Sequence, residues 1–295
     1  MTHRRAVLTM LIVTLLWSIA GVVTRHLESA AAFEVTFWRS AANAVALLAL
    51  LCWRDGAGAL SHRIRHGGRL LWLSALCWCV MFTAFMVAMT LTTVANVLVT
   101  MALAPIFTAL IARFALGHRL PLRTWLAMLV AALGIGWMYG SQLAGGRASD
   151  MAGTLVALTV PVAGASMWTL LQHNAQGGAG QGDMTPAVLL GAALSTLITL
   201  PLSLPMQASL HDVLLLCGLG VVQLAIPCMM AVSAGRVLKA PEAALLGLLE
   251  ILFGVAWTWA GSDERPTAAV LGGGSLVLVA LAVNEWLALR QRANA

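Results

Sequence analysis

The amino-acid sequence predicts an all-α polytopic membrane protein with ten transmembrane helices, arranged as two inverted five-helix repeats. Three observations support this prediction. First, 60% of the residues are apolar and only 9% are charged, whereas a soluble domain carries roughly a quarter of charged residues. Second, apolar stretches long enough to cross a bilayer recur along the whole chain. Third, the last three spans of the first half align with the last three spans of the second half without a gap.

The apolar stretches predict where the membrane spans lie. A transmembrane helix needs roughly 17–25 mainly apolar residues. Such stretches are expected to be helical, because lipid offers the backbone no hydrogen-bond partners. The ten predicted spans cover residues 6–24, 33–53, 70–90, 94–114, 122–141, 152–171, 186–205, 212–233, 241–261 and 268–289.

The basic residues predict the orientation in the bacterial inner membrane. Cytoplasmic loops of membrane proteins are enriched in Lys and Arg. If the N-terminus is cytoplasmic, the outer loops contain only three basic residues, namely Arg25, Arg147 and Arg265. The other basic loop residues then all lie on the cytoplasmic side. The sequence therefore predicts that both termini are cytoplasmic and that the number of spans is even.

An internal repeat predicts the domain organisation. A shift of 145 residues places the third to fifth spans on the eighth to tenth without a gap, with Leu103 on Leu248 and Pro121 on Pro266. We therefore divide the chain into a first repeat, residues 1–141, and a second repeat, residues 150–295. Because each repeat has five spans, the two are predicted to insert with opposite orientations. Inverted repeats are the usual build of secondary transporters, whose substrate site lies near the membrane midplane.

Several short motifs in the predicted spans match the loose pattern of a known family. They are Trp17-Ser18 in the first span, Arg39 in the second, Ala102-Leu103-Ala104-Pro105-Ile106 in the fourth, Ala115-Leu116-Gly117-His118-Arg119-Leu120 at its end, and Gly134-Ile135-Gly136 in the fifth. Together with the ten-span arrangement they resemble the drug/metabolite transporter superfamily in its ten-helix EamA-type branch. His118 departs from the family pattern, which usually has an acidic residue at this place.

The resemblance implies a transporter that exports small metabolites by alternating access through a central cavity, without a cofactor. Amino acids with aromatic or other apolar side chains are the expected substrates, because the aromatic amino acid exporters are the most similar branch. A multidrug or quaternary-cation exporter is the alternative within transport. The expected partners are the small-molecule substrate and membrane lipid. The sequence is compatible with both a monomer and a homodimer.

One face of the third span is predicted to line the substrate cavity. Trp78, Phe82 and Phe85 recur at helical spacing and therefore share a face. The 145-residue shift aligns Trp78 with Gln223 and Phe85 with Met230 of the eighth span. An apolar wall with one polar anchor suits a small-molecule cavity, although such a face can also pack against helices or lipid. The further candidates for substrate contact on other spans are Trp17, Asn96, Thr100 and Trp168.

Three charged residues within spans are candidates for function. Glu250 is predicted near the centre of the ninth span, where a charge costs at least ~2.5–3.5 kcal/mol. It could bind a substrate ammonium group, carry a coupling proton, or act as a protonated structural hydrogen-bond donor. Arg39 follows Glu34 by five residues in the second span. We expect a structural Arg–Glu ion pair there, and capture of a substrate carboxylate by the guanidinium is the alternative.

The sequence argues against an enzyme, a metalloprotein or a nucleic-acid-binding protein. All seven histidines lie in loops or at span ends, so no catalytic residues are predicted. The five cysteines lack the spacing of a disulfide framework or a metal site. The net charge of +6 comes from short basic runs between apolar stretches, which is not a nucleic-acid footprint. A non-transporting membrane scaffold and an intramembrane enzyme are the alternatives from other classes.

Overall fold

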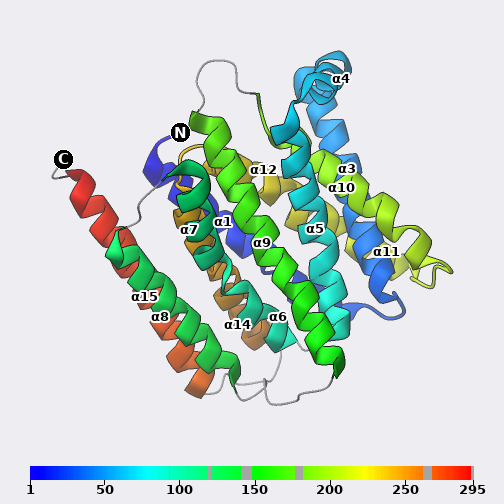
Figure 1. Ribbon diagram of the computed structural model, residues 1–295. Coiled ribbons are helices and arrows are strands. Elements are labelled where there is room, and N and C mark those ends of the chain that lie inside the picture. The colour runs from blue at the N-terminus through cyan, green and yellow to red at the C-terminus, as the bar shows by residue number, and fades with distance from the viewer. Residues whose placement is uncertain (93, 118–120, 141–147, 177–181, 262–267, 294–295) are drawn as a thin grey trace.

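A computed structural model describes the chain except for residues 93, 118–120, 141–147, 177–181, 262–267 and 294–295. The described residues form helices and no strands, which confirms the all-α class. The helices run side by side as a bundle (Figure 1). Five helical segments in the described part are long and apolar enough to cross a membrane, which indicates a multi-pass membrane protein. They are His3–Val23, Ala32–Asp55, Arg69–Leu91, Met151–Gln176 and Leu210–Ala234.

The first half of the chain contains eight of the α-helices described. In chain order they are α1 (His3–Trp17), α2 (Ala20–Val23), α3 (Ala32–Asp55), α4 (Ala57–His66), α5 (Arg69–Leu91), α6 (Val94–Met101), α7 (Ala104–Leu116) and α8 (Leu122–Tyr139). A short 3-10 helix, η1 (Thr24–His26), follows α2. The first and fourth predicted spans are therefore each broken into two helices. Helix α4 occupies a polar stretch in which no helix was predicted.

The second half begins with the longest helix described. Its elements are α9 (Ala148–Gln176), α10 (Thr185–Thr199), η3 (Pro201–Ser203), α11 (Leu210–Leu219), the π-helix η4 (Gly220–Ala225), α12 (Ile226–Ala234), α13 (Ala240–Gly247), α14 (Leu249–Gly261) and α15 (Ala268–Ala293). The eighth predicted span contains the π-helical segment in its middle. The ninth predicted span is broken between α13 and α14.

Two of these breaks occur at equivalent places in the two halves. The fourth span is interrupted around Leu103, and the ninth at Leu248. Adding 145 residues to the bounds of α7 gives the bounds of α14. Proline at the start of α7, Pro105, fits a first helical turn but would clash with the preceding turn of a continuous helix.

Helices α5 and α10 approach each other closely because a glycine lies between them. A Cβ atom on Gly191 of α10 would lie 2.5 Å from the Cβ of Trp78 and 2.8 Å from the carbonyl oxygen of Ala75, both on α5. Small residues allow such backbone contact between helices in lipid. The same principle applies to the neighbouring helices α8 and α15, where a Cβ on Gly134 would lie 2.7 Å from the carbonyl oxygen of Gly273 (Figure 1).

At the end of the bundle where α3 begins, two buried carboxylates join the halves of the chain. Glu34, in the first turn of α3, accepts hydrogen bonds from the backbone N–H groups of Gln207 at 2.7 Å and Ala208 at 3.1 Å. Asp212 of α11 accepts hydrogen bonds from three successive backbone N–H groups at 2.9 Å each, those of Glu28, Ser29 and Ala30. Each half thus caps a segment of the other.

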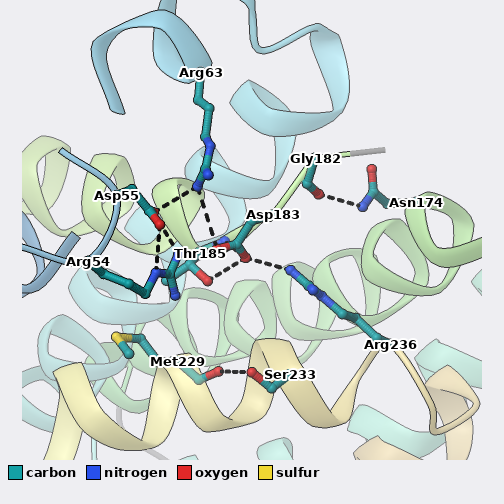
Figure 2. A network of polar contacts seen from close by, with 10 residues as sticks. All are labelled: Arg54, Asp55, Arg63, Asn174, Gly182, Asp183, Thr185, Met229, Ser233 and Arg236. Carbon is teal, nitrogen blue, oxygen red and sulfur yellow. Dashed lines mark hydrogen bonds and ion pairs between the residues drawn. The ribbon is translucent and has the colours of Figure 1, made fainter. Parts of the chain in front are cut away.

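At the opposite end, a network of arginines and aspartates joins the halves (Figure 2). Arg54, at the end of α3, forms ion pairs with Asp55 at 2.8 Å and with Asp183 at 2.5 Å. Arg63 of α4 also binds Asp55, at 2.8 Å. Arg236, after α12, binds Asp183 at 2.5 Å. The network therefore ties α3 and α4 to the start of α10 and the end of α12.

Asp183 lies outside the membrane-spanning helices, in the segment before α10. Partial burial alone would raise the pKa of its carboxyl group. Hydrogen bonds from the hydroxyl and backbone N–H of Thr185, together with the nearby Arg54 and Arg236, outweigh this effect and lower the pKa. The carboxylate is therefore charged at neutral pH, and its contribution to stability is lost only as the pH falls through the lowered pKa.

The close contact at Gly191 predicts a selective effect of added side-chain volume. Gly191→Ala should destabilise the protein by about 1–3 kcal/mol, because the methyl group forces α5 and α10 apart. The measurement is the thermal unfolding midpoint in detergent. Gly218→Ala is the matched control, since no atom of the described chain lies within 4 Å of a Cβ at that helical position. Equal midpoints for the two variants would contradict the described contact.

Candidate functional site

Arg39 of α3 lies at the centre of a polar cluster in the interior of the bundle. The residue is only 5% exposed. Its Nη2 donates a hydrogen bond to Oε1 of Gln223 at 2.8 Å, and its Nη1 contacts Sδ of Met86 at 2.9 Å. Its Nε is buried and has no hydrogen-bond partner among the residues that the structure describes. The guanidinium is therefore held by one amide and one weak sulfur acceptor, with donor capacity left over.

Gln223 is positioned by the π-helix between α11 and α12. Pro227 lacks the N–H that would bond to the carbonyl of Gln223 in a regular α-helix, which favours the wider turn. Gly220 brings this segment against α3, because a Cβ there would lie 2.5 Å from the carbonyl oxygen of Arg39. Nε2 of Gln223 donates to the carbonyl of Trp17 at 3.1 Å. Gln223 thereby connects α1, α3 and η4.

Glu250 lies beside this cluster, in the first turn of α14. The ninth predicted span is not one continuous helix, because it is interrupted at Leu248, two residues before Glu250. A new helix start favours a carboxylate there through the helix dipole. Glu250 is half-buried and interacts electrostatically with Arg39, but within the described chain it forms no hydrogen bond or ion pair. Cys228 of α12 lies close to both charges.

The expected ion pair between Arg39 and Glu34 does not form. The Glu34 carboxylate is occupied by the backbone N–H groups of Ala31, Gln207 and Ala208. Arg39 instead turns to Gln223 of the other half of the chain. The reason is that Glu34 caps the start of α3 at one end of the bundle. Backbone N–H groups there compete with the guanidinium for the Glu34 carboxylate.

The predicted aromatic face of α5 is divided between two environments. Trp78 is 1% exposed and lies in the contact with α10, so its ring is packed rather than accessible in this conformation. It stacks on Phe82 with ring centroids 5.5 Å apart. Phe82 and Phe85 are half-buried, and Phe85 packs with a separate apolar cluster that includes Ala88 and Val97.

The other predicted contact residues are spread over the bundle. Trp17 and Met230 are half-buried against the main apolar core, and Trp17 joins the cluster through its carbonyl group. Trp168 is 6% exposed and Thr100 is 7% exposed. The backbone of Asn96 is part of α6, and its side chain lies outside the described part of the structure.

Sequence reasoning missed Met86 and a hydroxyl cluster near Arg39. The hydroxyl of Ser195 in α10 lies 3.0 Å from that of Ser40 in α3 and 2.9 Å from that of Thr83 in α5. These hydrogen bonds join three helices, as polar side chains in lipid commonly do. The sequence feature that could have indicated this cluster is the presence of isolated hydroxyl side chains within apolar stretches. Met86 follows Phe82 by one helical turn, and this spacing could have placed it on the same face of α5.

Comparison with known proteins supports the fold. A solved structure, described only as the crystal structure of a protein, is similar with a TM-score of 0.76 at 18% sequence identity, over 98% of this chain and 99% of that chain. This likeness concerns the fold alone. No curated protein is significantly similar to the chain. The model of the EamA-like transporter family matches residues 4–140, a little under half of the chain. This match confirms the resemblance predicted from the sequence.

Proposed function

We propose that the protein exports small metabolites, foremost amino acids with aromatic or other apolar side chains, by alternating access across the bacterial inner membrane. The observation that carries this proposal is the arrangement of Arg39 and Glu250. Their charges interact inside the bundle, yet they do not close into an ion pair. A zwitterionic ligand has the two opposite charges that would complete such an arrangement.

The guanidinium of Arg39 supplies the carboxylate side of this site. A charge in the membrane interior is costly and usually marks a substrate or ion pathway. Arg39 lacks an anionic hydrogen-bond partner in the described chain, and its contact with Met86 uses a weak acceptor. A substrate carboxylate that replaces the sulfur would form charge-assisted hydrogen bonds, which are stronger. The movement of Met86 would accompany substrate entry.

Glu250 supplies the ammonium side. Its partial exposure and its lack of a hydrogen bond or ion pair within the described chain leave the carboxylate available to a ligand. The neighbouring guanidinium repels cations, so this site favours a zwitterion over a quaternary cation. Phe82 and Phe85 of α5, both half-buried, are the proposed apolar contacts for the side chain of the substrate.

The architecture proposed for transport has ten spans in two inverted repeats, residues 1–141 and 150–295. The spans are α1–α2, α3, α5, α6–α7 and α8, followed by α9, α10, α11–α12, α13–α14 and α15. The equivalent breaks before α7 and α14 support the repeat, and broken helices commonly form transporter binding sites. The start of α1, helix α4 and the end of α15 lie at one end of the bundle (Figure 1), as an even number of spans requires.

Charge removal at the two residues should separate the roles of the substrate groups. Arg39→Gln and Glu250→Gln should each raise the KM for phenylalanine export roughly 10- to 100-fold, because each removes a charge-assisted interaction. Efflux of labelled substrate from proteoliposomes measures this effect. In competition assays, phenethylamine should lose potency only in the Glu250 variant, and 3-phenylpropionate only in the Arg39 variant.

The exposed Glu28 supplies a matched control, since Glu28→Gln removes one carboxylate outside the cluster and should leave transport unchanged. Export of lipophilic cations without export of amino acids would replace the proposal with a multidrug exporter. A pH response lost in Glu250→Gln, with an unchanged KM, would assign Glu250 to proton coupling. Normal transport by both charge variants would exclude the site.

The proposed orientation is tested by reporter fusions. A fusion after residue 60 should place the reporter in the cytoplasm, and a fusion after residue 145 should place it in the periplasm. The physical reason is the retention of basic loops on the cytoplasmic side. Alkaline phosphatase, which is active only in the periplasm, and green fluorescent protein, which fluoresces in the cytoplasm, report the two locations. The opposite location of either reporter would contradict the proposed ten-span arrangement.

A further inference from the structure

Helix α4 is amphipathic and lies at one end of the bundle (Figure 1). Its inner face is apolar: Leu60 is 3% exposed, and the half-buried Ile64 packs against the same core. Its outer face exposes Ser61, His62, Arg65 and His66. Gly56, with a φ of 85°, lets the chain turn sharply from α3 into α4, a conformation that disfavours other residues. The helix therefore presents a polar face beside the end of a membrane span.

Two tryptophans mark the depth of α4 relative to the membrane. Trp53, in the last turn of α3, is 85% exposed, and Trp72, in the first turn of α5, is 48% exposed. Exposed tryptophans at span ends favour the membrane–water interface, where the indole ring sits at the level of the lipid headgroups. Because these two residues flank α4 in the chain, the helix lies at headgroup level.

The arginines of this region fall into two classes. Arg54 and Arg63 form ion pairs with Asp55 and Asp183 in the network described above. Arg65, near the end of α4, and Arg69, at the start of α5, are exposed. Neither side chain has a hydrogen bond or an ion pair with any other residue that the structure describes. Two guanidinium groups without an ion pair in the described part of the chain therefore lie at headgroup level.

We propose that α4 and its flanks, with Arg65, Arg69, Trp53 and Trp72 as the contact residues, form a docking surface for the headgroup of an anionic phospholipid. Guanidinium groups bind phosphate oxygens in a bidentate manner. The flanking tryptophans favour a lipid over a free anion, because their rings contact the interfacial region of a bilayer. The Arg–Asp network fixes α4 and keeps its outer face turned to this surface.

The test measures lipid binding by the full-length protein in detergent, using native mass spectrometry with phosphatidylglycerol and phosphatidylcholine. The double variant Arg65→Gln/Arg69→Gln should bind phosphatidylglycerol roughly 30-fold more weakly, at about fivefold for each basic residue near a lipid surface. Binding of phosphatidylcholine should not change. Arg4→Gln/Arg5→Gln is the matched control, because it removes two exposed arginines at the start of α1, and it should retain phosphatidylglycerol binding.

Three outcomes would overturn the proposal. Unchanged phosphatidylglycerol binding in Arg65→Gln/Arg69→Gln would exclude the surface. Equal loss in both double variants would indicate a general effect of net charge. Displacement of the lipid by excess glycerol phosphate would indicate an anion site that does not require a bilayer lipid. An unaltered thermal midpoint of each variant in phosphatidylcholine nanodiscs verifies that the protein remains folded.

Discussion

A guanidinium group inside a membrane protein must be held by acceptors that the protein itself supplies, and Gln223 is the acceptor that holds Arg39. Their hydrogen bond joins α3 of the first half to the π-helix of the second, and the other end of the Gln223 amide reaches the carbonyl of Trp17. Two nearby residues, Gly220 and Pro227, give the backbone the shape that this hydrogen bond requires. Gly220 allows the close approach to α3, and Pro227 favours the wide turn that carries Gln223.

The two ends of the bundle are joined by different kinds of interaction. At one end, the carboxylates of Glu34 and Asp212 are fully buried and satisfied by several backbone N–H groups, which makes each of them costly to remove. At the other end, Arg54, Arg63 and Arg236 are substantially exposed. Exposed ion pairs contribute little individually, because solvent screens them. The halves are therefore joined more firmly where α3 begins than where it ends.

The sequence predicted the class of fold and the positions of apolar segments well, because hydropathy depends on composition within a window. It did not predict the breaks at Leu103 and Leu248, because the hydropathy summed over a window is the same for a continuous helix and a broken one. Helix α4 was missed because its apolar face consists mainly of Leu60 and Ile64 within a polar stretch. The bounds of α7 and α14 differ by 145 residues, the same shift that aligns spans in the sequence.

The candidate site was predictable only in part, because spacing along a helix shows which residues share a face but not what covers that face. Trp78 and Phe82 share a face of α5, yet Gly191 brings α10 against Trp78 and buries it. Glu34 was expected to pair with Arg39, but its partners come from residues 207 and 208, which no local pattern indicates. The contact between Arg39 and Gln223 likewise depends on two segments that are distant in the chain.

The central claim is that a zwitterionic substrate binds between the charges of Arg39 and Glu250. An experimental structure of the full-length protein with phenylalanine bound tests it most directly. The account predicts density for the amino acid with its carboxylate at the guanidinium of Arg39, its ammonium group at Glu250, and Met86 displaced from Arg39. Phenylalanine bound at another place, with the Arg39–Met86 contact intact, would contradict the account.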